Sequence, residues 1–386
     1  MEVHMRRILL SLTLVLFVLC FGVPALAVWQ TPVQLTSNSV SESVPSIKGD
    51  GTVIAYMTND GDDEIYSAEY SSPNWSNYRA TSNTVSDQCP SISRDGTLLA
   101  YALVAAGVRE IRCKTHPFNL SAPVTIDSGP STYPIANPSV NSDGTKIAYD
   151  KLVSGSGYEI YIAEYSGGTW QAPVRVTNNS VHDRRPSING DGTKIAFQVN
   201  DEIYFVEYSG GAWQSPVQLT NNSTPDQIPD INSDGTKIAY WGDDGTGEWQ
   251  VWFVEYSGGA WQFPVQVTNS ISDVLYPSIN ADGTRIAYAA DDGSDYEIYC
   301  AEYSGGTWNS VQVTDNTGYD SETSINADGT KIAYSGYDGS DYEIYFVEDS
   351  AATASIPTLS EWGMIIFALL TLATAFVFIR RKSISC

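Results

Sequence analysis

The chain has 386 residues, of which 42% are hydrophobic and 12% aromatic, so it has ample material for a buried core. Because a single core usually stops growing near ~250–300 residues, we expect either several domains or a repeat architecture. The formal net charge of −25 argues against nucleic acid and anionic lipid headgroups as partners, and it favours an exported protein kept soluble by its acidic surface.

The N-terminal residues have the pattern of an export signal. Arg6 and Arg7 precede an apolar run from Ile8 to Val23, and Ala25 to Ala27 supply the small residues that a signal peptidase needs. We therefore predict a signal peptide over residues 1–27, with Val28 as the first residue of the exported chain. An uncleaved N-terminal anchor is the alternative interpretation.

Repeats organise the chain that follows. The stretch SINADGTRIAY (Ser278 to Tyr288) is one of seven similar copies, which start 43 to 48 residues apart. Their Asp-Gly pairs begin at Asp50, Asp95, Asp143, Asp191, Asp234, Asp282 and Asp328. Seven copies at this period fit neither helical-hairpin repeats nor a single globular core.

Each copy has the features of four short β-strands. Two β-rich runs flank the Asp-Gly pair, which supports the positive φ of a tight hairpin. A third run such as EIYFVEY (Glu202 to Tyr208) is rich in aromatic and β-branched residues, and a glycine turn leads to a fourth run, such as WQSPVQLT (Trp213 to Thr220). Four antiparallel strands per copy are typical of a propeller blade. We predict an all-β fold, a seven-bladed β-propeller over residues 28–350, with six blades as the rival count.

The exported chain opens with the end of a repeat. VWQTPVQLT (Val28 to Thr36) matches the fourth strand of the later copies, whereas the last copy stops at EIYFVEDS (Glu343 to Ser350) without one. The N-terminal segment therefore supplies the missing strand of the last blade. A ring closed in this way leaves no open sheet edge.

Three cysteines lie in the exported part of the chain, Cys89, Cys113 and Cys300. Cys113 and Cys300 take a repeat position that other copies fill with hydrophobic side chains, namely Ile162, Phe205, Phe253 and Phe346. This indicates small buried side chains and predicts no structural disulfide.

The repeated phrase P-S-I-x-x-D-G-T-x-I-A-Y, followed by E-I-Y, resembles the β-propeller repeats of TolB-like proteins. The resemblance covers essentially all of residues 28–349. It implies the propeller fold and carries no Tol-Pal role, since the N-terminal α/β domain of TolB has no counterpart in this sequence.

The C-terminal residues form a three-part tail. We predict a tether with a short motif over residues 351–363, then a transmembrane helix over residues 364–379 and a basic cytoplasmic tail over residues 380–386. The helix is short, so Trp362 at the interface and a snorkelling Arg380 must help it to span.

This tail resembles the IPTL-CTERM sorting signal, a relative of PEP-CTERM. The matching motif residues are Ile356, Pro357, Thr358, Leu359, Trp362 and Gly363. The resemblance implies an exosortase-type sorting enzyme as partner and the surface of a Gram-negative bacterium as destination. A plain single-pass anchor is the alternative, and the sequence leaves open whether the tail is cleaved.

Acidic residues gather where one face of the predicted ring would lie. The loops that enter each blade carry Glu42, Asp87, Asp183, Asp226, Asp273 and Asp320. The hairpins between the second and third strands add candidate Ca²⁺ ligands, which are Asp60, Asp62, Asp63, Asp243, Asp244, Asp291, Asp292, Asp295, Asp338 and Asp341. Ca²⁺ takes six to eight oxygen ligands, which such carboxylates can supply, although none of these hairpins matches the twelve-residue calcium loop. We predict no other cofactor. A basic protein partner and simple solvated hairpins are the alternatives.

Motifs for catalysis are missing. Outside the signal segment the only histidines are His116 and His182, and the chain has no G-x-S-x-G, H-E-x-x-H or Cys/His metal spacing. We therefore predict no enzyme and no catalytic residues. The preferred hypothesis is an exported cell-surface binding or scaffold module that holds a protein, glycan or cation at its acidic face. The alternative is a secreted carbohydrate-active hydrolase that uses a carboxylate pair.

Overall fold

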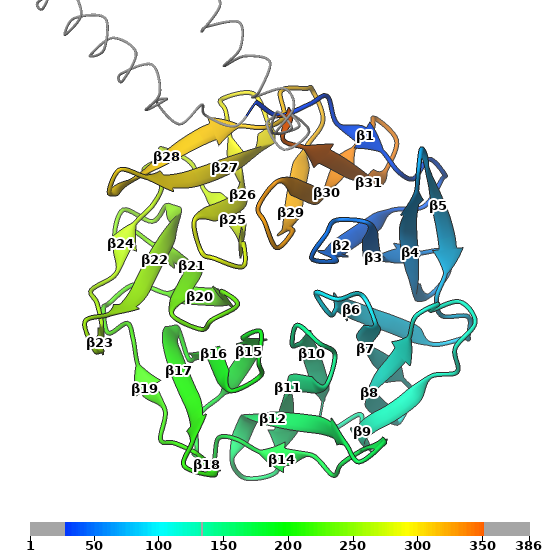
Figure 1. Cartoon of the computed structure of the whole chain (residues 1–386), viewed down its shortest axis with the longest axis vertical. Coiled ribbons are helices and arrows are strands. Elements are labelled where there is room, and N and C mark those ends of the chain that lie inside the picture. Colours follow the sequence, from blue (N-terminus) through cyan, green and yellow to red (C-terminus); the bar gives the residue numbers. More distant parts are fainter. Residues whose placement is uncertain (1–27, 133, 351–386) are drawn as a thin grey trace, which may run out of the picture. The chain divides into compact units, whose positions relative to one another are not determined.

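The structure, a computed structural model, describes residues 28–132 and 134–350. Residues 29–348 form one ring of seven antiparallel sheets around a central channel (Figure 1). The predicted signal peptide, sorting motif, transmembrane helix and basic tail lie outside the described residues. Within the described part, no helix has the length and apolar character needed to cross a membrane.

Blades 1 to 3 follow one another along the chain. Their strands are β2 (Glu42–Ile47), β3 (Val53–Asn59), β4 (Asp63–Ser71) and β5 (Asn74–Arg79) in blade 1, β6 (Ser86–Ile92), β7 (Leu98–Ala105), β8 (Val108–Thr115) and β9 (Val124–Pro130) in blade 2, and β10 (Ile135–Val140), β11 (Lys146–Val153), β12 (Gly157–Ser166), β13 (Thr169–Trp170) and β14 (Val174–Arg175) in blade 3.

Blades 4 to 6 repeat this order. Their strands are β15 (Asp183–Ile188), β16 (Lys194–Val199), β17 (Glu202–Ser209), β18 (Ala212–Trp213) and β19 (Val217–Gln218) in blade 4, β20 (Asp226–Ile231), β21 (Lys237–Asp243), β22 (Trp249–Ser257), β23 (Ala260–Trp261) and β24 (Val265–Gln266) in blade 5, and β25 (Val274–Ile279), β26 (Arg285–Asp291), β27 (Tyr296–Ser304) and β28 (Thr307–Gln312) in blade 6. The first strand of each blade is the innermost (Figure 1).

Blade 7 confirms the predicted closure. It contains β29 (Asp320–Ile325), β30 (Lys331–Tyr337) and β31 (Tyr342–Glu348), and its outer strand is β1 (Val33–Gln34). Val33 pairs with Phe346 in antiparallel register. The Gln30 and Leu35 N–H groups extend the pairing by donating to carbonyls of β31 at 2.8 Å each. The seven-blade count and the role of the N-terminal segment are therefore both correct.

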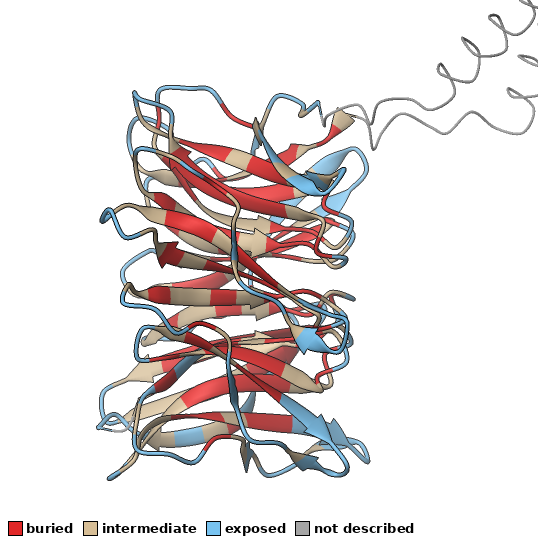
Figure 2. Ribbon diagram, turned by 90° about the vertical axis from the view of Figure 1, so that its left-hand side faces the viewer, coloured by how far each residue is buried: buried red, intermediate tan, exposed pale blue. Residues whose placement is uncertain are grey.

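The core lies between blades rather than in one centre. Seven clusters of buried side chains each combine residues of two neighbouring sheets, and Figure 2 shows the buried residues along the strands through the depth of the ring. The cluster at the closure joins Leu35 and Ile54 to Ile344 and Phe346. Each blade buries its apolar faces against its neighbours, so the ring must close before every face is covered.

The tryptophan that leads the fourth strand makes much of this contact. Trp261 of blade 5 lies 4.9 Å, centroid to centroid, from Phe205 of blade 4, and Trp75 of blade 1 lies 5.1 Å from Phe346 of blade 7. Blade 2 lacks this tryptophan. Phe118, which is completely buried, packs against blade 1 in its place. Cys113 and Cys300 are buried at the third-strand position that the repeats predicted.

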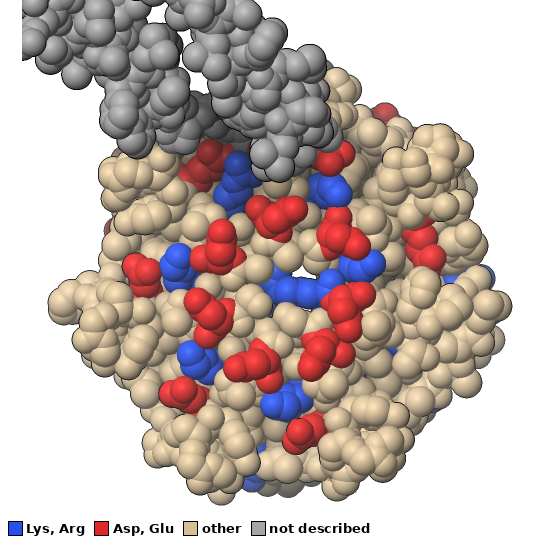
Figure 3. Space-filling model, in the orientation of Figure 1, with Lys and Arg blue, Asp and Glu red and all other residues tan. Residues whose placement is uncertain are grey.

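The Asp-Gly hairpins close a ring of their own on the face shown in Figure 3. In all seven, the aspartate Oδ1 accepts the N–H of the threonine two residues later, at 2.9 to 3.0 Å. Glycine follows the aspartate because the turn requires a positive φ, as at Gly51 with +74°. The lysine after the threonine often reaches the next blade, and the Lys146 Nζ donates to the Asp191 carbonyl at 3.1 Å.

Backbone hydrogen bonds run from hairpin to hairpin around this end of the channel. The donors and acceptors are Gly49 to Arg94, Asp95 to Ser142, Ser142 to Gly190, Gly190 to Ser233, Ser233 to Ala281, Ala281 to Ala327 and Ala327 to Gly49, at 2.8 to 3.0 Å. The seven bonds form a closed circuit. The Asp-Gly hairpin face is therefore a structural collar that holds the blades together.

Candidate functional site

The other end of the channel is lined by one unusual residue from each blade. In every first strand the pairing with the second strand is interrupted by a β-bulge. A residue in the bulge has a φ of 49° to 54°, in the left-handed region. These seven bulge residues are Val44, Cys89, Asn137, Arg185, Ile228, Tyr276 and Glu322.

The sequence encodes this bulge through a proline. Six of the bulge residues stand directly before proline, which lacks the N–H that a regular strand would need and is therefore confined to bulges and edges. A left-handed φ costs about 1–3 kcal/mol for a residue other than glycine, more where the side chain is β-branched, as in Val44 and Ile228. Seven strained residues at one position point to a functional role for the channel mouth.

The bulge residues surround a cavity of about 490 Å³ that we call the channel mouth. Its lining includes all seven of them together with the residue that follows each one. Two of their side chains are apolar, and the others are a thiol, an amide, a guanidinium, a phenol and a carboxylate. No two blades contribute the same residue type. The repeat is thus most variable at the position that faces the channel.

Two carboxylates hold neighbouring bulges in place. Asp150, which is completely buried on β11, accepts the Asn137 Nδ2 at 2.7 Å and the Arg185 N–H at 3.0 Å. Glu322 accepts the Val44 N–H at 2.7 Å through its Oε2. Burial raises the pKa of Asp150. These contacts fix the backbone at the mouth, which leaves the Arg185 guanidinium and the Tyr276 phenol as donors for a ligand.

The thiol at the mouth is not activated. Burial raises the pKa of Cys89, and the nearby charge of Asp150 raises it further. Because only the thiolate is a good nucleophile, Cys89 is poorly suited to covalent catalysis near neutral pH. The pKa of Tyr276 is raised by burial and by Glu322, so its phenol keeps its proton and can donate a hydrogen bond.

Deeper in the channel, a second circuit of hydrogen bonds links the first strands. In each blade a side chain on the first strand accepts an N–H from the next blade. The acceptors are Ser46, Ser91, Ser139, Ser187, Asp230, Ser278 and Ser324. Asp230 stands where the other blades have serine, and its charge attracts Arg94. Burial lowers the pKa of Arg94 and raises that of Asp230.

Aromatic side chains lie beside the channel mouth in blades 5 to 7. Trp241 on β21 lies 4.4 Å from Trp249 and 6.2 Å from Tyr276, between ring centroids. In blades 6 and 7, Tyr319 lies 4.7 Å from Tyr296 and 6.3 Å from Tyr342. Tyr276 and Tyr319 also interact electrostatically. We call these residues, together with Tyr337, the aromatic belt.

Several members of the belt are available for contact. Tyr276 is 37% exposed and Tyr337 is 39% exposed, while Trp241, Trp249 and Tyr319 are half-buried. The indole Nε1 of Trp241 has no hydrogen-bond partner among the described residues. A buried donor without a partner costs free energy unless a ligand or water accepts it. The belt therefore combines flat apolar surface with an unused donor beside the mouth.

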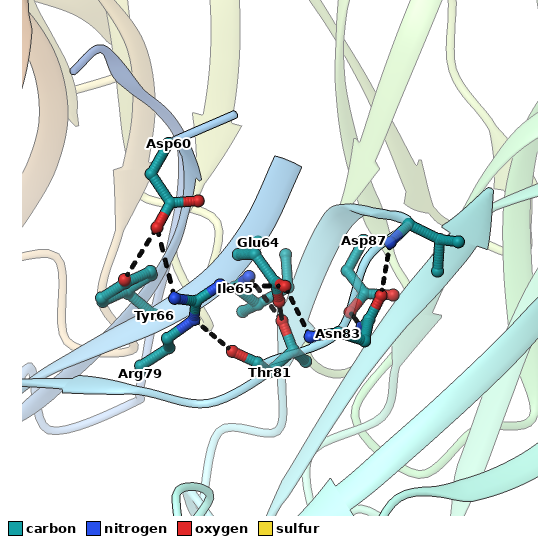
Figure 4. A network of polar contacts seen from close by, with 9 residues as sticks. Asp60, Glu64, Ile65, Tyr66, Arg79, Thr81, Asn83 and Asp87 are labelled. Carbon is teal, nitrogen blue, oxygen red and sulfur yellow. Dashed lines mark hydrogen bonds and ion pairs between the residues drawn. The ribbon is translucent and has the colours of Figure 1, made fainter. Parts of the chain in front are cut away.

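Most acids in the entering loops do not lie on the surface, contrary to expectation. Glu42, Asp87, Asp183, Asp226 and Asp320 are at most 2% exposed, because each begins or nearly begins the first strand and points into the seam with the preceding blade. Figure 4 shows the seam between blades 1 and 2. There the Asn83 side chain donates to Asp87 at 2.6 Å, and its N–H donates to Glu64 at 2.8 Å.

This arrangement recurs at five seams. An acid near the start of the third strand, buried in all but blade 4, faces the buried acid of the next blade, with a threonine and an asparagine between them. Burial raises the pKa of Glu42 to about 8, of Asp320 to about 7, and of Asp87, Asp183 and Asp226 to about 6. At the seam between blades 5 and 6 both acids are replaced, by Gln250 and Val274. The acids thus occur in pairs that serve the seams.

The ten predicted Ca²⁺ ligands lie in four separate hairpins. Asp60, Asp62 and Asp63 are in the β3–β4 hairpin, Asp243 and Asp244 in β21–β22, Asp291, Asp292 and Asp295 in β26–β27, and Asp338 and Asp341 in β30–β31. In the first hairpin Asp60 pairs with Arg79 at 3.4 Å. In the second, Asp244 Oδ1 caps Thr246, accepting its N–H at 2.8 Å.

Only the hairpins of blades 6 and 7 bring acids into one group among the described residues. Asp292 and Asp295 lie with Glu297, and Asp338 and Asp341 lie with Glu343, so that the three ligand atoms of each group are within 4.8 Å of one another. Sequence reasoning missed both glutamates. The signal was the spacing D-G-S-D-Y-E, which only these two hairpins share.

A larger cavity, of about 950 Å³, lies elsewhere, between blades 2 and 3. Its polar groups are already engaged: His116 pairs with Glu69 at 3.3 Å, and Asp95 and Asp143 cap the threonines of their own hairpins. Cys113 lines this cavity at the position where blades 4, 5 and 7 have phenylalanine. We therefore regard it as a packing gap beside the divergent blade 2.

Sequence reasoning missed the bulge residues and the aromatic belt. Aligning the repeats shows a proline inside a strand preceded by a position that changes in every copy, which is the signal that was available. The belt has no such signal. Its members come from loops and strand ends that only the ring brings together.

Comparison with solved structures places the ring among known propellers. An oligogalacturonate lyase from Vibrio parahaemolyticus is 12% identical, with a TM-score of 0.61 over 83% of this chain and 98% of the lyase. The propeller domain of the Trilobed protease from Pyrococcus furiosus is 13% identical, with a TM-score of 0.58 over 81% of this chain and 96% of that domain. A prolyl endopeptidase is 12% identical, with a TM-score of 0.60 over 81% of this chain and 47% of its own. No curated protein gives a significant match.

The prediction that the protein is not an enzyme is wrong. It relied on missing motifs, yet the lyase and the prolyl endopeptidase share this fold and are enzymes. At such low identity the likeness extends to the fold alone. The correction is therefore that the absence of these motifs in a propeller does not exclude catalysis.

Family models match two parts of the chain. The IPTL-CTERM motif matches residues 354–381, which implies an exosortase-type sorting system and an exported propeller. The TolB β-propeller domain matches residues 123–360, more than half of the chain. Both resemblances inferred from the sequence are confirmed, and the chain belongs to the TolB β-propeller domain family.

Proposed function

We propose that the channel mouth and the aromatic belt bind a neutral saccharide chain at the cell surface. The observation that carries this proposal is the continuity of the two features through Tyr276, which lines the mouth and also lies 6.2 Å from Trp241. Sugar rings present flat C–H faces that pack on aromatic rings, while their hydroxyl groups need both donors and acceptors nearby.

The channel mouth suits the end of such a chain. Arg185 and Tyr276 supply donors, and Glu322 and Asn137 supply acceptors, around a cavity of about 490 Å³. Pockets that hold small ligands have volumes of about 300–1,000 Å³. The belt then supports the following sugars across blades 6 and 7, where Tyr319 lies between Tyr296 and Tyr342.

Charge favours a neutral ligand over an acidic one. The net charge of −25 repels anionic polymers, and the exposed hairpins near the belt carry Asp292 and Asp338. Carboxylates accept hydrogen bonds from sugar hydroxyls without needing a countercharge. A neutral glycan therefore fits this face better than a uronic acid polymer does.

The sorting motif supports a location at the cell surface, where such glycans occur. We propose that the predicted helix over residues 364–379 holds the chain in the membrane until an exosortase-type enzyme processes the tail, and that the propeller then remains at the surface of a Gram-negative cell. The matching test is mass spectrometry of the C-terminus of the protein from its own cells. A tail retained in full to Cys386 would contradict processing.

Calorimetric titration of the full chain with neutral oligosaccharides, such as cello-, xylo- and malto-series chains, tests the ligand proposal. Tyr319→Ala and Tyr276→Ala should each weaken binding about tenfold or more, because aromatic anchors carry most of the binding energy at such sites. Tyr208→Ala is the matched control, since Tyr208 is 43% exposed beside Trp213 at a third-to-fourth-strand turn, away from the belt.

Equal loss in the control, or tighter binding of an oligogalacturonate than of every neutral chain, would overturn the proposal. Release of shorter sugars is measured in the same samples, because enzymes occur in this fold. If shorter sugars are released, and Tyr276→Ala and Tyr319→Ala reduce this release as they reduce binding, the same site would be assigned to carbohydrate cleavage.

A further inference from the structure

In six blades the third strand carries an aromatic side chain that pairs with one residue of the fourth strand. In blade 1 this pair is Tyr66 and Arg79, and in blade 5 it is Trp252 and Gln266. The other blades with glutamine at the fourth-strand position have Gln218, Gln312 and Gln34. The repeats therefore contain the aromatic side chain both with and without an arginine beside it.

Blade 1 shows what this position can hold. The Arg79 guanidinium carbon lies 5.8 Å from the centroid of the Tyr66 ring. Its nitrogens lie 3.4 Å from Asp60 and 3.1 Å from Glu64, as Figure 4 shows. The face of an aromatic ring attracts a cation, and the carboxylates add charge-assisted contacts. In blade 1 an arginine of the chain itself thus fills the position.

Blade 5 keeps the aromatic ring and the acids but not the arginine. Asp244 stands where blade 1 has Asp60, directly before the hairpin glycine, and Asp243 precedes it. The Oδ1 atoms of Asp243 and Asp244 accept N–H groups of their own hairpin, from Gly245 at 2.7 Å and Thr246 at 2.8 Å. No lysine or arginine among the described residues forms an ion pair with either acid.

The glutamine of blade 5 does not replace the missing arginine. In blade 6 the Gln312 amide donates at 3.4 Å to Asp292, the counterpart of Asp244, and the corresponding pair interacts in blade 7. Within the described structure Gln266 makes no hydrogen bond to Asp244. Blade 5 therefore presents an aromatic ring and an aspartate that no group of the chain connects.

A cavity of about 610 Å³ lies at this place, between blades 4 and 5. Trp252, Tyr240, Asp243 and Asp244 line it, and its lining contains no lysine or arginine. Phe263 also lines the cavity and is 94% exposed. Blades 7, 3 and 4 have threonine, alanine and serine at the position of Phe263. The cavity thus has room for a cationic side chain and an exposed apolar ring beside it.

We propose that this cavity binds an arginine side chain of a basic partner protein. Trp252 takes the place of Tyr66, and Asp243 and Asp244 take the place of the two carboxylates of blade 1. Tryptophan offers the best face for a cation, and guanidinium both stacks on aromatic rings and pairs with carboxylates. The net charge of −25 attracts a basic chain, and Phe263 can pack against its apolar atoms. This proposal is independent of the saccharide.

Calorimetric titration of the full chain with a short peptide of alternating arginine and glycine tests the proposal. The titration is run at about 150 mM salt, where non-specific attraction between exposed charges is screened. The lysine counterpart of the peptide should bind several-fold more weakly, because an ammonium group does not stack or form a fork with carboxylates. The glutamine counterpart should not bind.

The decisive variant is Gln266→Arg, which gives blade 5 the arginine of blade 1. The new side chain should occupy the site from within and weaken binding of the arginine peptide about tenfold or more. The variant should fold, because blade 1 holds the same kind of pair at the same register. The matched control is Gln312→Arg in blade 6, which has the same strand position and the same change in charge, and it should change the affinity less than about twofold.

Phe263→Ser introduces the residue of blade 4 and removes only an exposed ring. It should weaken peptide binding several-fold and leave the melting temperature unchanged. The proposal is overturned if the unmodified chain does not bind the arginine peptide, or if the lysine or glutamine peptide binds equally well. It is also overturned if Gln266→Arg binds like the unmodified chain, or if Gln312→Arg loses binding to the same extent.

Discussion

The two ends of the central channel are built from the same seven repeats and differ in almost every other respect. At the Asp-Gly end, all seven aspartates cap a threonine in the same way, and a circuit of backbone bonds joins neighbouring hairpins. At the other end, no two bulge residues are alike, and each has a strained backbone. Repetition therefore marks the end that holds the ring together, and variation marks the end that is free to bind.

The largest expected effect comes from deleting the strand that closes the ring, because both ends of the channel depend on closure. Deleting residues 28–36 removes β1, the Trp29 side chain packed against blade 6, and Thr36, whose hydroxyl accepts the Ile344 N–H at 2.8 Å. Blade 7 then exposes an edge, and the apolar faces at the closure lose their cover. We expect loss of the cooperative unfolding transition in circular dichroism. A deleted chain that melts like the full one would show that closure does not support the ring.

The next largest effect is the pH dependence of stability that the buried acids at the seams between blades cause. Glu42 has its pKa raised from 4.5 to about 8, so between these values the unfolded chain loses a proton that the folded chain keeps. The free energy of unfolding should therefore fall as pH rises from about 5 to 8. Urea midpoints measured with a chelator should decrease over this range, and Glu42→Gln should flatten the decrease. Stability that rises with pH in this window would contradict the assignment.

The protein itself contains a natural control for that experiment. The seam between blades 5 and 6 has Gln250 and Val274 in place of two acids. Copying it into the seam between blades 1 and 2, as Glu64→Gln with Asp87→Val, should give a folded protein with a weaker pH dependence. A failure to fold would show that the acid pairs are needed at each seam separately.

A smaller effect is expected in the hairpin collar. A Cβ at Gly190 would lie 2.8 Å from the Ser233 carbonyl oxygen, to which the Gly190 N–H donates. Gly190→Val should therefore destabilise the protein by about 1–3 kcal/mol in urea unfolding. Lys48→Gln, which removes a surface ion pair of 2.9 Å with Asp50, is the control and should change stability by less than about 1 kcal/mol. The reverse order would mean that charges, not backbone contacts, hold the collar.

The smallest expected effect is a substitution that does not destabilise the protein. Ile228 is β-branched with a φ of +49°, a conformation that glycine adopts freely. Ile228→Gly should leave stability unchanged or raise it by up to about 1 kcal/mol, because relief of strain offsets the lost contacts and the greater freedom of the unfolded chain. Equilibrium unfolding measures this directly. A loss of more than about 2 kcal/mol would mean that the bulge side chains are part of the core.

Much of the fold could be predicted from short-range patterns. The D-G-T turns, the E-I-Y strands and the tryptophan-led fourth strand are local features whose physics acts within a few residues. The unfinished last copy also required only counting. The candidate site was harder. Asp338 and Asp341 do lie in one hairpin, but Glu343 was left out of the predicted ligands, and Glu42 was read as a loop residue when it is buried against Glu343.

The sequence by itself determined the blade, the number of blades and the strand that closes the ring, because hairpin turns and alternating strands depend on near neighbours in the chain. Only the tertiary structure decided which side chains face the channel, since that depends on a bulge within the first strand of each blade. It also decided that Tyr276 meets Trp241 and that Glu343 meets Glu42, a pair 301 residues apart. Such contacts arise from the closed ring, whose geometry no single repeat contains.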